Sequence, residues 1–271
     1  MNINGIQLEV RKIAGPSGPA PLIFLHEGLG SLSLWTQRGL DWPQAVCSAT
    51  GRAGVVYSRR GYGQSEPAGS GDESSGDYAR HGRGKGSRPT RLPPDYMHRE
   101  AWEVLPALLH ELQIEKPVLL GHSDGATIAL LYASRNSASA CIAMAPHVLV
   151  EGIAIEAITQ ARVAFESGGL RERLARYHAD VDGAFWQWNE VWLSAGFRSF
   201  DIRAECRRIT APLLLIQGFN DEYGTLLQLD EIALAAPHAV QLRLANCGHS
   251  PHRDLPEKTL EAVAAFLQNV A

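Results

Sequence analysis

The pentapeptide Gly-His-Ser-Asp-Gly at residues 121–125 has residue types and a spacing that could make a serine hydroxyl reactive. The mainly apolar run 116–120 before it predicts a buried strand, and the apolar run 126–132 after it predicts a helix. A G-x-S-x-G sequence between a strand and a helix forms a tight turn that lifts the serine hydroxyl out of the sheet. Glycines are expected on both sides because the two backbones come too close there for a Cβ atom. The pattern predicts that Ser123 is a nucleophile.

A serine hydroxyl is a poor nucleophile near neutral pH, and it needs a base that is itself oriented by a carboxylate. The chain supplies both groups after Ser123. Asp221 follows the apolar run 213–216, and His249 follows the run 240–244, so each lies just past the end of a predicted strand. These two residues are the candidate carboxylate and the candidate base.

The elements that must position these side chains are visible as apolar runs. Residues 22–25, 54–57 and 140–145 are continuously apolar or nearly so, and residues 6–10 alternate. Such runs, separated by helical patterns, predict a mostly parallel sheet covered on both faces. A helix is expected after Pro94, with Asp95 as its N-cap and a kink at Pro106.

Two long segments carry no strand pattern. Residues 68–91 are rich in Gly, Ser and charged residues, which predicts a solvated surface loop. Residues 147–205 contain amphipathic helical stretches and a dense aromatic patch, and they stand between two strands of one sheet. We therefore expect an α/β core made of residues 1–146 and 206–271, with a helical cap at 147–205. The chain ends with a predicted helix from 256 to 267.

The chain order Ser, Asp, His is that of the α/β-hydrolases, and the chain resembles this fold family over nearly its full length. The family includes esterases, lipases and hydrolases of carbon–carbon bonds. The resemblance implies that Ser123 is the nucleophile, that His249 is the general base and acid, and that Asp221 orients His249. No cofactor is implied.

The sequence also offers two rival assignments and a candidate metal site. His252 is a second candidate base, but the family places the histidine directly after a glycine, as in Gly248-His249. Glu222 is a second candidate carboxylate, but Asp221 has the family's G-x-x-D spacing from Gly218. A metal site made of His249, His252 and Asp254 is not expected, because a separate and well-spaced ligand set is missing.

An acyl-transfer enzyme also stabilises an oxyanion, usually with two backbone N–H groups. The resemblance implies that these belong to Asp124, at a helix N-terminus, and to Gly28 in the turn 26–30. The chain departs from the family at two places nearby. Glu27 replaces the usual glycine of the turn, and Ser58 replaces the usual aspartate of the D-x-R-G-x-G-x-S stretch, which we interpret as structural.

Asp124 is the sharpest indication of the substrate, because a carboxylate beside the reacting carbonyl would hinder an oxyanion unless a cation is bound. The same Ser-Asp-Gly core occurs in biphenyl-hydrolase-like aminoacyl-ester hydrolases, which the sequence resembles and whose Asp recognises the substrate's α-ammonium group. Glu27 would add to this acidic lining. The alternative is structural: Asp124 caps its helix, and Arg59 or Arg60 neutralises Glu27.

The remainder of the substrate is expected to lie in an apolar pocket under the cap. Trp186, Trp188 and Trp192 are candidates for its wall, although all three cannot lie on one helical face. His147 stands where the chain leaves the sheet for the cap and is a further candidate lining residue.

Composition limits the other possibilities. The 271 residues carry a net charge of −4, so nothing favours a nucleic acid or an anionic membrane as a partner. The four scattered cysteines, the lack of a signal-peptide pattern and the lack of a long apolar run predict a cytoplasmic protein that acts on a small molecule, with a homodimer as a candidate assembly.

The leading hypothesis is a serine hydrolase for small carboxylic esters. Alternatives on the same fold are a carbon–carbon bond hydrolase, which the acidic Asp124 disfavours, and a proline iminopeptidase-like peptidase. A non-catalytic ligand receptor is the alternative from another class.

Overall fold

The computed structural model describes residues 1–69, 92–268 and 270 of the chain. The loop predicted at 68–91 therefore lies almost wholly outside the described residues. Among the helices that are described, none is both long enough and apolar enough to cross a membrane.

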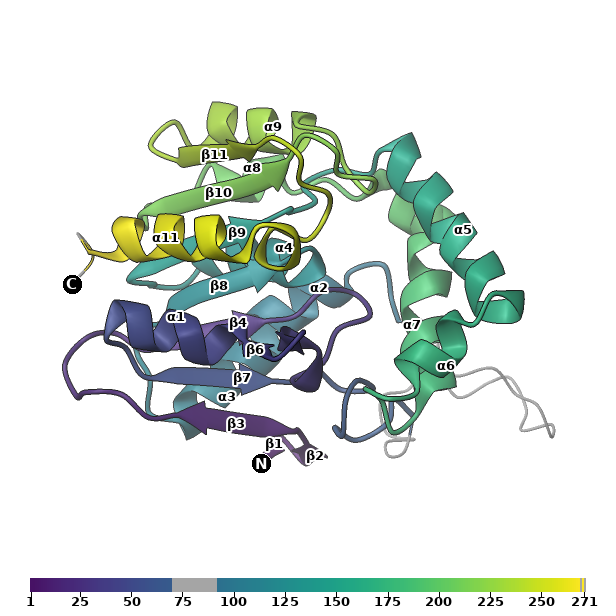
Figure 1. Ribbon diagram of the computed structural model, residues 1–271, viewed down its shortest axis with the longest axis horizontal. Helices are drawn as coiled ribbons and strands as arrows, with labels where there is room; N and C mark the ends of the chain where they lie inside the picture. Colours follow the sequence, from purple (N-terminus) through teal and green to yellow (C-terminus); the bar gives the residue numbers. More distant parts are fainter. Residues whose placement is uncertain (70–91, 269, 271) are drawn as a thin grey trace.

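A seven-stranded sheet forms the centre of the described structure, in the order β11-β10-β9-β8-β4-β7-β3 (Figure 1). Its strands in chain order are β3 (Val10–Ile13), β4 (Leu22–Leu25), β7 (Gly54–Tyr57), β8 (Val118–His122), β9 (Ala140–Met144), β10 (Leu213–Gly218) and β11 (Val240–Leu244). All neighbouring strands pair in parallel except β3 and β7, which are antiparallel. The mostly parallel sheet predicted from the apolar runs is confirmed.

The prediction of one strand at 6–10 is wrong. A hairpin of β1 (Asn2–Ile3) and β2 (Ile6–Gln7) turns at Asn4 and Gly5, both of which have positive φ angles. An Asn-Gly pair favours such a two-residue turn. The hairpin ends the pairing of this segment at Gln7, and the edge strand of the main sheet begins only at Val10.

Helices cover both faces of the sheet, because alternate residues of each strand point to opposite sides. On β4, Leu22 and Phe24 belong to one buried cluster, whereas Ile23 and Leu25 belong to the other. The first cluster is closed by α1 (Trp42–Thr50) and α11 (Pro256–Leu267), which lie on the same face in Figure 1. The second is closed by α2 (Tyr96–Arg99), α3 (Leu105–Glu111), α4 (Asp124–Ala133), α8 (Arg203–Cys206) and α9 (Leu227–Ala235).

The helix expected after Pro94 is interrupted where a proline was predicted to kink it. A π-helical stretch, η2 (Glu100–Val104), joins α2 to α3, and Pro106 stands in the first turn of α3. Proline has no N–H to donate to the preceding turn, so the regular hydrogen-bond pattern breaks there. Asp95 precedes α2 as expected, but its carboxylate bonds Arg99 instead of a helix N–H.

Three helices that follow β9 and precede β10 form a layer over the carboxyl ends of the strands (Figure 1). We call α5 (Gly152–Ser167), α6 (Leu170–Leu174) and α7 (Val181–Trp192) the cap helices. His178, between α6 and α7, accepts a hydrogen bond from the N–H of Gly63 at 3.0 Å. Its other ring nitrogen donates to the carbonyl of Leu29 at 3.1 Å. One buried imidazole thus ties the cap helices to two turns of the core.

The remaining elements are short. They are η1 (Ser33–Trp35), β5 (Thr36–Gln37), β6 (Leu40–Asp41), η3 (Ala195–Ser199) and α10 (Pro251–Asp254).

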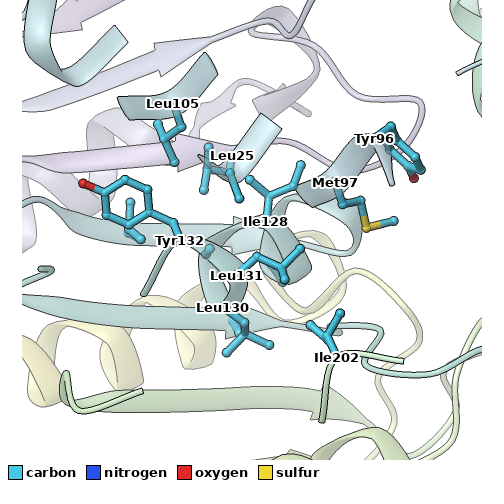
Figure 2. Packing of buried hydrophobic residues seen from close by; sticks show 14 of the residues in the cluster. Leu25, Tyr96, Met97, Leu105, Ile128, Leu130, Leu131, Tyr132 and Ile202 are labelled. Atoms are coloured by element: carbon cyan, nitrogen blue, oxygen red, sulfur yellow. The ribbon is translucent and has the colours of Figure 1, made fainter. Parts of the chain in front are cut away.

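Helix α4 is buried on every side. Figure 2 shows Ile128, Leu130 and Leu131 of this helix packed among side chains of neighbouring elements, including Leu25 and Ile202. At its first turn, a Cβ atom on Gly125 would lie 2.0 Å from the carbonyl oxygen of Leu25. Only glycine allows β4 and α4 to approach this closely.

We expect Gly125→Ala to lower the free energy of unfolding by about 2 kcal/mol or more, because an added methyl group must displace backbone instead of a flexible side chain. Gly152→Ala is the matched control, since a Cβ atom at Gly152 meets no atom within 4 Å. Urea unfolding of both variants measures the effect. Equal stability of the two variants would contradict the close approach.

Candidate active site

Ser123 stands between β8 and α4 in a backbone conformation that few residues adopt, with φ 55° and ψ −120°. The turn is as tight as the sequence predicts, because a Cβ atom on Gly121 would lie 2.1 Å from the carbonyl oxygen of Gly125. The N–H of Ser123 donates to the carbonyl of Met144 at 2.9 Å, which ties the turn to β9. The turn therefore holds the serine at the carboxyl edge of the sheet.

The structure brings Ser123, His249 and Asp221 together, although they are far apart in sequence. Nε2 of His249 lies 2.9 Å from Oγ of Ser123, and Nδ1 of His249 lies 2.8 Å from Oδ1 of Asp221. All three residues are buried. This is the arrangement in which an imidazole can take the serine proton while a carboxylate orients the ring.

Asp221 is held by several donors besides His249. Its Oδ1 accepts hydrogen bonds from the N–H groups of Tyr223 and Gly224, and its Oδ2 accepts one from Nε2 of Gln217 at 3.1 Å. Burial alone raises the pKa of Asp221, but His249 and the N–H of Tyr223 outweigh burial and lower that pKa below its ordinary value. Sequence reasoning missed Gln217, whose only signal is a polar residue near the end of an apolar strand.

The two rival residues occupy other positions. His252 packs against Trp35 and Trp42, with ring centroids 4.9 and 5.5 Å away, and neither ring nitrogen has a hydrogen-bond partner among the described residues. The carboxylate of Glu222 accepts from the backbone N–H of His249 at 3.2 Å and does not bond the ring. The geometry thus favours His249 and Asp221 as the partners of Ser123.

The two backbone groups expected to bind an oxyanion lie on one cavity wall with Ser123. The N–H groups of Gly28 and Asp124 have no acceptor within the described part of the chain. Gly28 also contacts the cap, because a Cβ atom there would lie 2.1 Å from Nε1 of Trp188. Within the described residues, both N–H groups therefore remain without a hydrogen-bond acceptor.

Glu27 is neutralised by Arg253, and the expectation that Arg59 or Arg60 does so is wrong. The Glu27 carboxylate bonds Nη2 of Arg253 and lies 3.5 Å from Nδ1 of His122. Arg59 instead donates to the backbone carbonyls of His26 and Glu27. Burial raises the pKa of Glu27, but Arg253 and His122 outweigh burial and bring that pKa well below its ordinary value. The carboxylate is therefore ionised and already paired.

The same contacts link Glu27 to the triad. His122 precedes the nucleophile, and its Nε2 donates to the backbone carbonyl of His249 at 2.7 Å. The residue that replaces the usual glycine in the turn 26–30 thus connects this turn to the serine turn and to the histidine loop. We interpret Glu27 as a residue that positions these three segments.

Asp124 is buried beside the triad and does not cap its helix, since its side chain bonds residues of other elements. The hydroxyl of Tyr96 donates to Oδ2 of Asp124 at 2.5 Å, and Nη2 of Arg59 lies 3.9 Å from the same oxygen. Nε1 of Trp192 donates to the Tyr96 hydroxyl at 3.0 Å. Burial raises the pKa of Asp124, and Arg59 and Tyr96 oppose that rise only in part. Its Oδ1 has no partner among the described residues.

Ser58, the other departure from the family pattern, is compensated by a distant residue. Its hydroxyl donates to Oε2 of Glu9 at 2.6 Å and accepts from the N–H of Leu32 at 2.8 Å. Glu9 also accepts from the N–H of Gln64 at 3.0 Å. Glu9 thus supplies a carboxylate where the family has an aspartate at position 58, which sequence reasoning missed.

A cavity of about 430 Å³ opens beside Ser123, beneath the cap helices. Trp188, Trp192 and His147 line it, as predicted from the sequence. Trp186 does not, because it packs against Phe165 and Phe185 with ring centroids 5.8 and 5.1 Å away. Successive positions on a helix face different directions, so Trp186 turns away from the cavity that Trp188 and Trp192 face.

His147 lies between the triad and the cap. Its ring centroid is 5.0 Å from that of Trp192 and 5.6 Å from that of His249. Burial, and to a lesser extent the nearby His249, lowers the pKa of His147 to about 3. The ring is therefore neutral near pH 7. Among the residues that the structure describes, no three His, Cys, Asp or Glu side chains gather in a way that would hold a metal ion.

Comparison with known proteins agrees with the observed fold. A family model described as "Alpha/beta hydrolase family" matches residues 22–262. The chain is 28% identical over 214 residues to "Putative carbamate hydrolase RutD" of Pseudomonas syringae pv. syringae (strain B728a), covering 68% of this chain and 80% of that protein.

Two solved structures share the fold across almost the whole chain. One is the enol-lactonase from Burkholderia xenovorans LB400, with a TM-score of 0.70, 20% identity and 98% of each chain covered. The other comes from work on carboxylesterases of the thaumarchaeon Nitrososphaera gargenis, with a TM-score of 0.70, 17% identity, and 98% of this chain and 95% of that chain covered.

We expect Glu27→Gln to lower the free energy of unfolding at neutral pH by about 1–3 kcal/mol, because it removes a charged hydrogen bond to Arg253 in a mostly buried site. Folding lowers the pKa of Glu27 from its ordinary 4.5. Its contribution is therefore fully present above about pH 4.5 and is lost as the pH falls through the folded-state pKa.

Urea unfolding at neutral pH and at a series of lower pH values measures this contribution. The difference between the native protein and Glu27→Gln should shrink as the pH falls below that value. Glu156→Gln, at an exposed position without an ion pair in the described residues, is the control. A Glu27→Gln variant as stable as the native protein at neutral pH would show that the pair with Arg253 contributes nothing.

Proposed function

The chain belongs to the alpha/beta hydrolase family, and on this premise we propose that it is a serine hydrolase that cleaves small carboxylic esters through an acyl-enzyme. The observation that carries the proposal is the continuous hydrogen-bonded line from Asp221 through His249 to Ser123. A receptor that does not catalyse a reaction has no need of this alignment.

The first half of the reaction follows from the tautomer that Asp221 selects. Nδ1–H of His249 donates to Asp221, so Nε2 is free to take the proton of Ser123. The serine oxygen then bonds the carbonyl carbon of the ester, and the carbonyl oxygen becomes an oxyanion. The N–H groups of Gly28 and Asp124 bind that oxygen.

Collapse of this intermediate breaks the bond to the alcohol, and Nε2 of His249 gives its proton to the leaving oxygen. A water molecule then loses a proton to His249 and attacks the acyl carbon. The acid leaves when the proton returns to the oxygen of Ser123. No cofactor takes part in these steps.

The similar proteins support acyl chemistry without fixing the acyl group. Their names specify a carbamate hydrolase, a lactonase and carboxylesterases, and each of these substrates has a carbonyl bonded to a heteroatom. We therefore place carboxylic esters first and treat carbamates as the nearest alternative. The fold alone does not select between them.

We expect Ser123→Ala to abolish both ester hydrolysis and covalent labelling by a fluorophosphonate. Asp221→Asn should retain labelling at a much lower rate and lower kcat by about 10²–10⁴-fold, because the imidazole loses its orienting charge. Asp230→Asn, on the exposed side of α9, is the control and should behave like the native protein. Failure of a fluorophosphonate to label the folded native protein would contradict the proposal.

A substrate with an α-ammonium group is favoured by one observation. Asp124 lines the cavity, and its buried Oδ1 has no hydrogen-bond partner among the described residues, which is a costly state for a carboxylate oxygen. A cation bound beside the reacting carbonyl would satisfy it. Glu27 gives no such support, because Arg253 already pairs with it.

We expect an α-amino acid ester to have a kcat/KM about tenfold or more above that of the same ester without its amino group, a difference of about 1.4 kcal/mol in the transition state. Asp124→Asn should remove most of this preference, and Ser123→Ala gives the background rate. Equal or faster hydrolysis of the deaminated ester by the native protein would show that Asp124 is structural.

A further inference from the structure

The cavity beside Ser123 has two arginines on its wall that the proposed chemistry does not use. Arg173 lies on the cap helix α6, and Arg176 lies one turn further along the chain. Nε of Arg176 lies 3.4 Å from the carbonyl oxygen of Arg173, so the two residues share a turn. Both are exposed, whereas Ser123 on the same cavity is buried. The arginines therefore mark the solvent side of the cavity.

Neither arginine has a carboxylate partner within 4.0 Å in the part of the chain that is described. Other arginines nearby do have such partners. Arg171, on the same helix, bonds Asp182 at 2.6 Å, and Arg253, on the same cavity, bonds Glu27. Within the described residues, the charges of Arg173 and Arg176 thus remain without a carboxylate to balance them.

The acidic residues of the cavity do not compensate these two charges. Glu27 is paired with Arg253, and Asp124 lies beside Arg59. Glu222 also lines the cavity, but its carboxylate bonds the backbone N–H of His249. Two like charges on one turn repel each other, so an anion bound between them would be favourable.

Apolar side chains line the cavity together with Ser123 and the two arginines. These apolar side chains include Ile158, Leu174 and Trp188. A substrate that fills this cavity would have its ester beside Ser123, an apolar part along this wall, and an end group beside Arg173 and Arg176.

We propose that the protein prefers esters that carry an anionic group, such as a carboxylate, at the end remote from the scissile carbonyl, and that Arg173 and Arg176 bind this group. The inference rests on the proposed ester hydrolysis and names the substrate class of the same site. It does not require the α-ammonium group.

Mono-4-nitrophenyl esters of linear dicarboxylic acids test the proposal. Adipate, suberate and sebacate provide three lengths, and the ω-amide of each is the neutral counterpart. For the best length we expect kcat/KM of the carboxylate to exceed that of the amide about fivefold or more at low salt, as for exposed charge pairs of good geometry. The ratio should fall at high salt, because ions screen exposed charges.

The double variant Arg173→Gln with Arg176→Gln should bring this ratio close to one. Arg171→Gln is the matched control, because Arg171 is on the same helix, is exposed, and does not line the cavity. It should keep the ratio of the native protein. Thermal melting of each variant checks that the fold is retained.

Three results would overturn the inference. Equal hydrolysis of carboxylate and amide esters by the native protein would remove the anionic preference and leave the ester hydrolase intact. A preference that survives in the double variant would show that other groups bind the anion. If no 4-nitrophenyl ester is hydrolysed above the Ser123→Ala background, the proposed function fails and the inference falls with it.

Discussion

The close approach of β4, β8 and α4 is the constraint on which the rest of the site depends. Gly125 lies against the carbonyl of Leu25, and Gly121 lies against that of Gly125, so no side chain fits at either position. This packing forces Ser123 into its unusual backbone conformation and presents its hydroxyl at the edge of the sheet. It also brings the start of α4 beside the turn that follows β4, so that Gly28, Ser123 and Asp124 line the same cavity. Looser packing of β4, β8 and α4 would move the Ser123 hydroxyl away from the N–H groups of Gly28 and Asp124, which we propose bind the oxyanion.

Charge pairing is the second constraint, because the site buries several ionisable groups in a small volume. The buried carboxylates have different partners: Glu27 is paired with Arg253, Asp221 bonds the His249 ring and backbone N–H groups, and Oδ2 of Asp124 lies near Arg59 and bonds the Tyr96 hydroxyl. The two departures from the family pattern fit this rule. The carboxylate of Glu27 is paired with Arg253, and the hydroxyl of Ser58 donates a hydrogen bond to the carboxylate of Glu9. Such substitutions are tolerated because a buried charge is far more costly when it has no partner than when it has one.

The sequence predicts the features that depend on the pattern of neighbouring residues. It does not predict which face of a helix meets the cavity, or which residues far apart in sequence come into contact. Apolar runs and flanking glycines were enough for the parallel sheet and for the turn at Ser123, since both are fixed by neighbouring residues. The hairpin at Asn4 and Gly5 was missed because the alternation of residues 6–10 looks the same in a hairpin and in an edge strand. The prediction that Trp186 lines the cavity is wrong because spacing alone does not say which face of α7 meets the cavity. The partners Arg253, Glu9 and Gln217 belong to distant or unmarked positions, so only the folded structure reveals them.

Direct observation of the acyl-enzyme tests the central claim most directly. The native protein would be mixed rapidly with 4-nitrophenyl butanoate, quenched in acid within the first turnover and analysed by intact-protein and peptide mass spectrometry. The triad geometry predicts a transient increase by one butanoyl group, located on the peptide that contains Ser123 and formed together with the release of one equivalent of 4-nitrophenol. Turnover of the ester without any adduct on Ser123, or with the adduct on another residue, would contradict the assignment of Ser123, His249 and Asp221 as the catalytic triad.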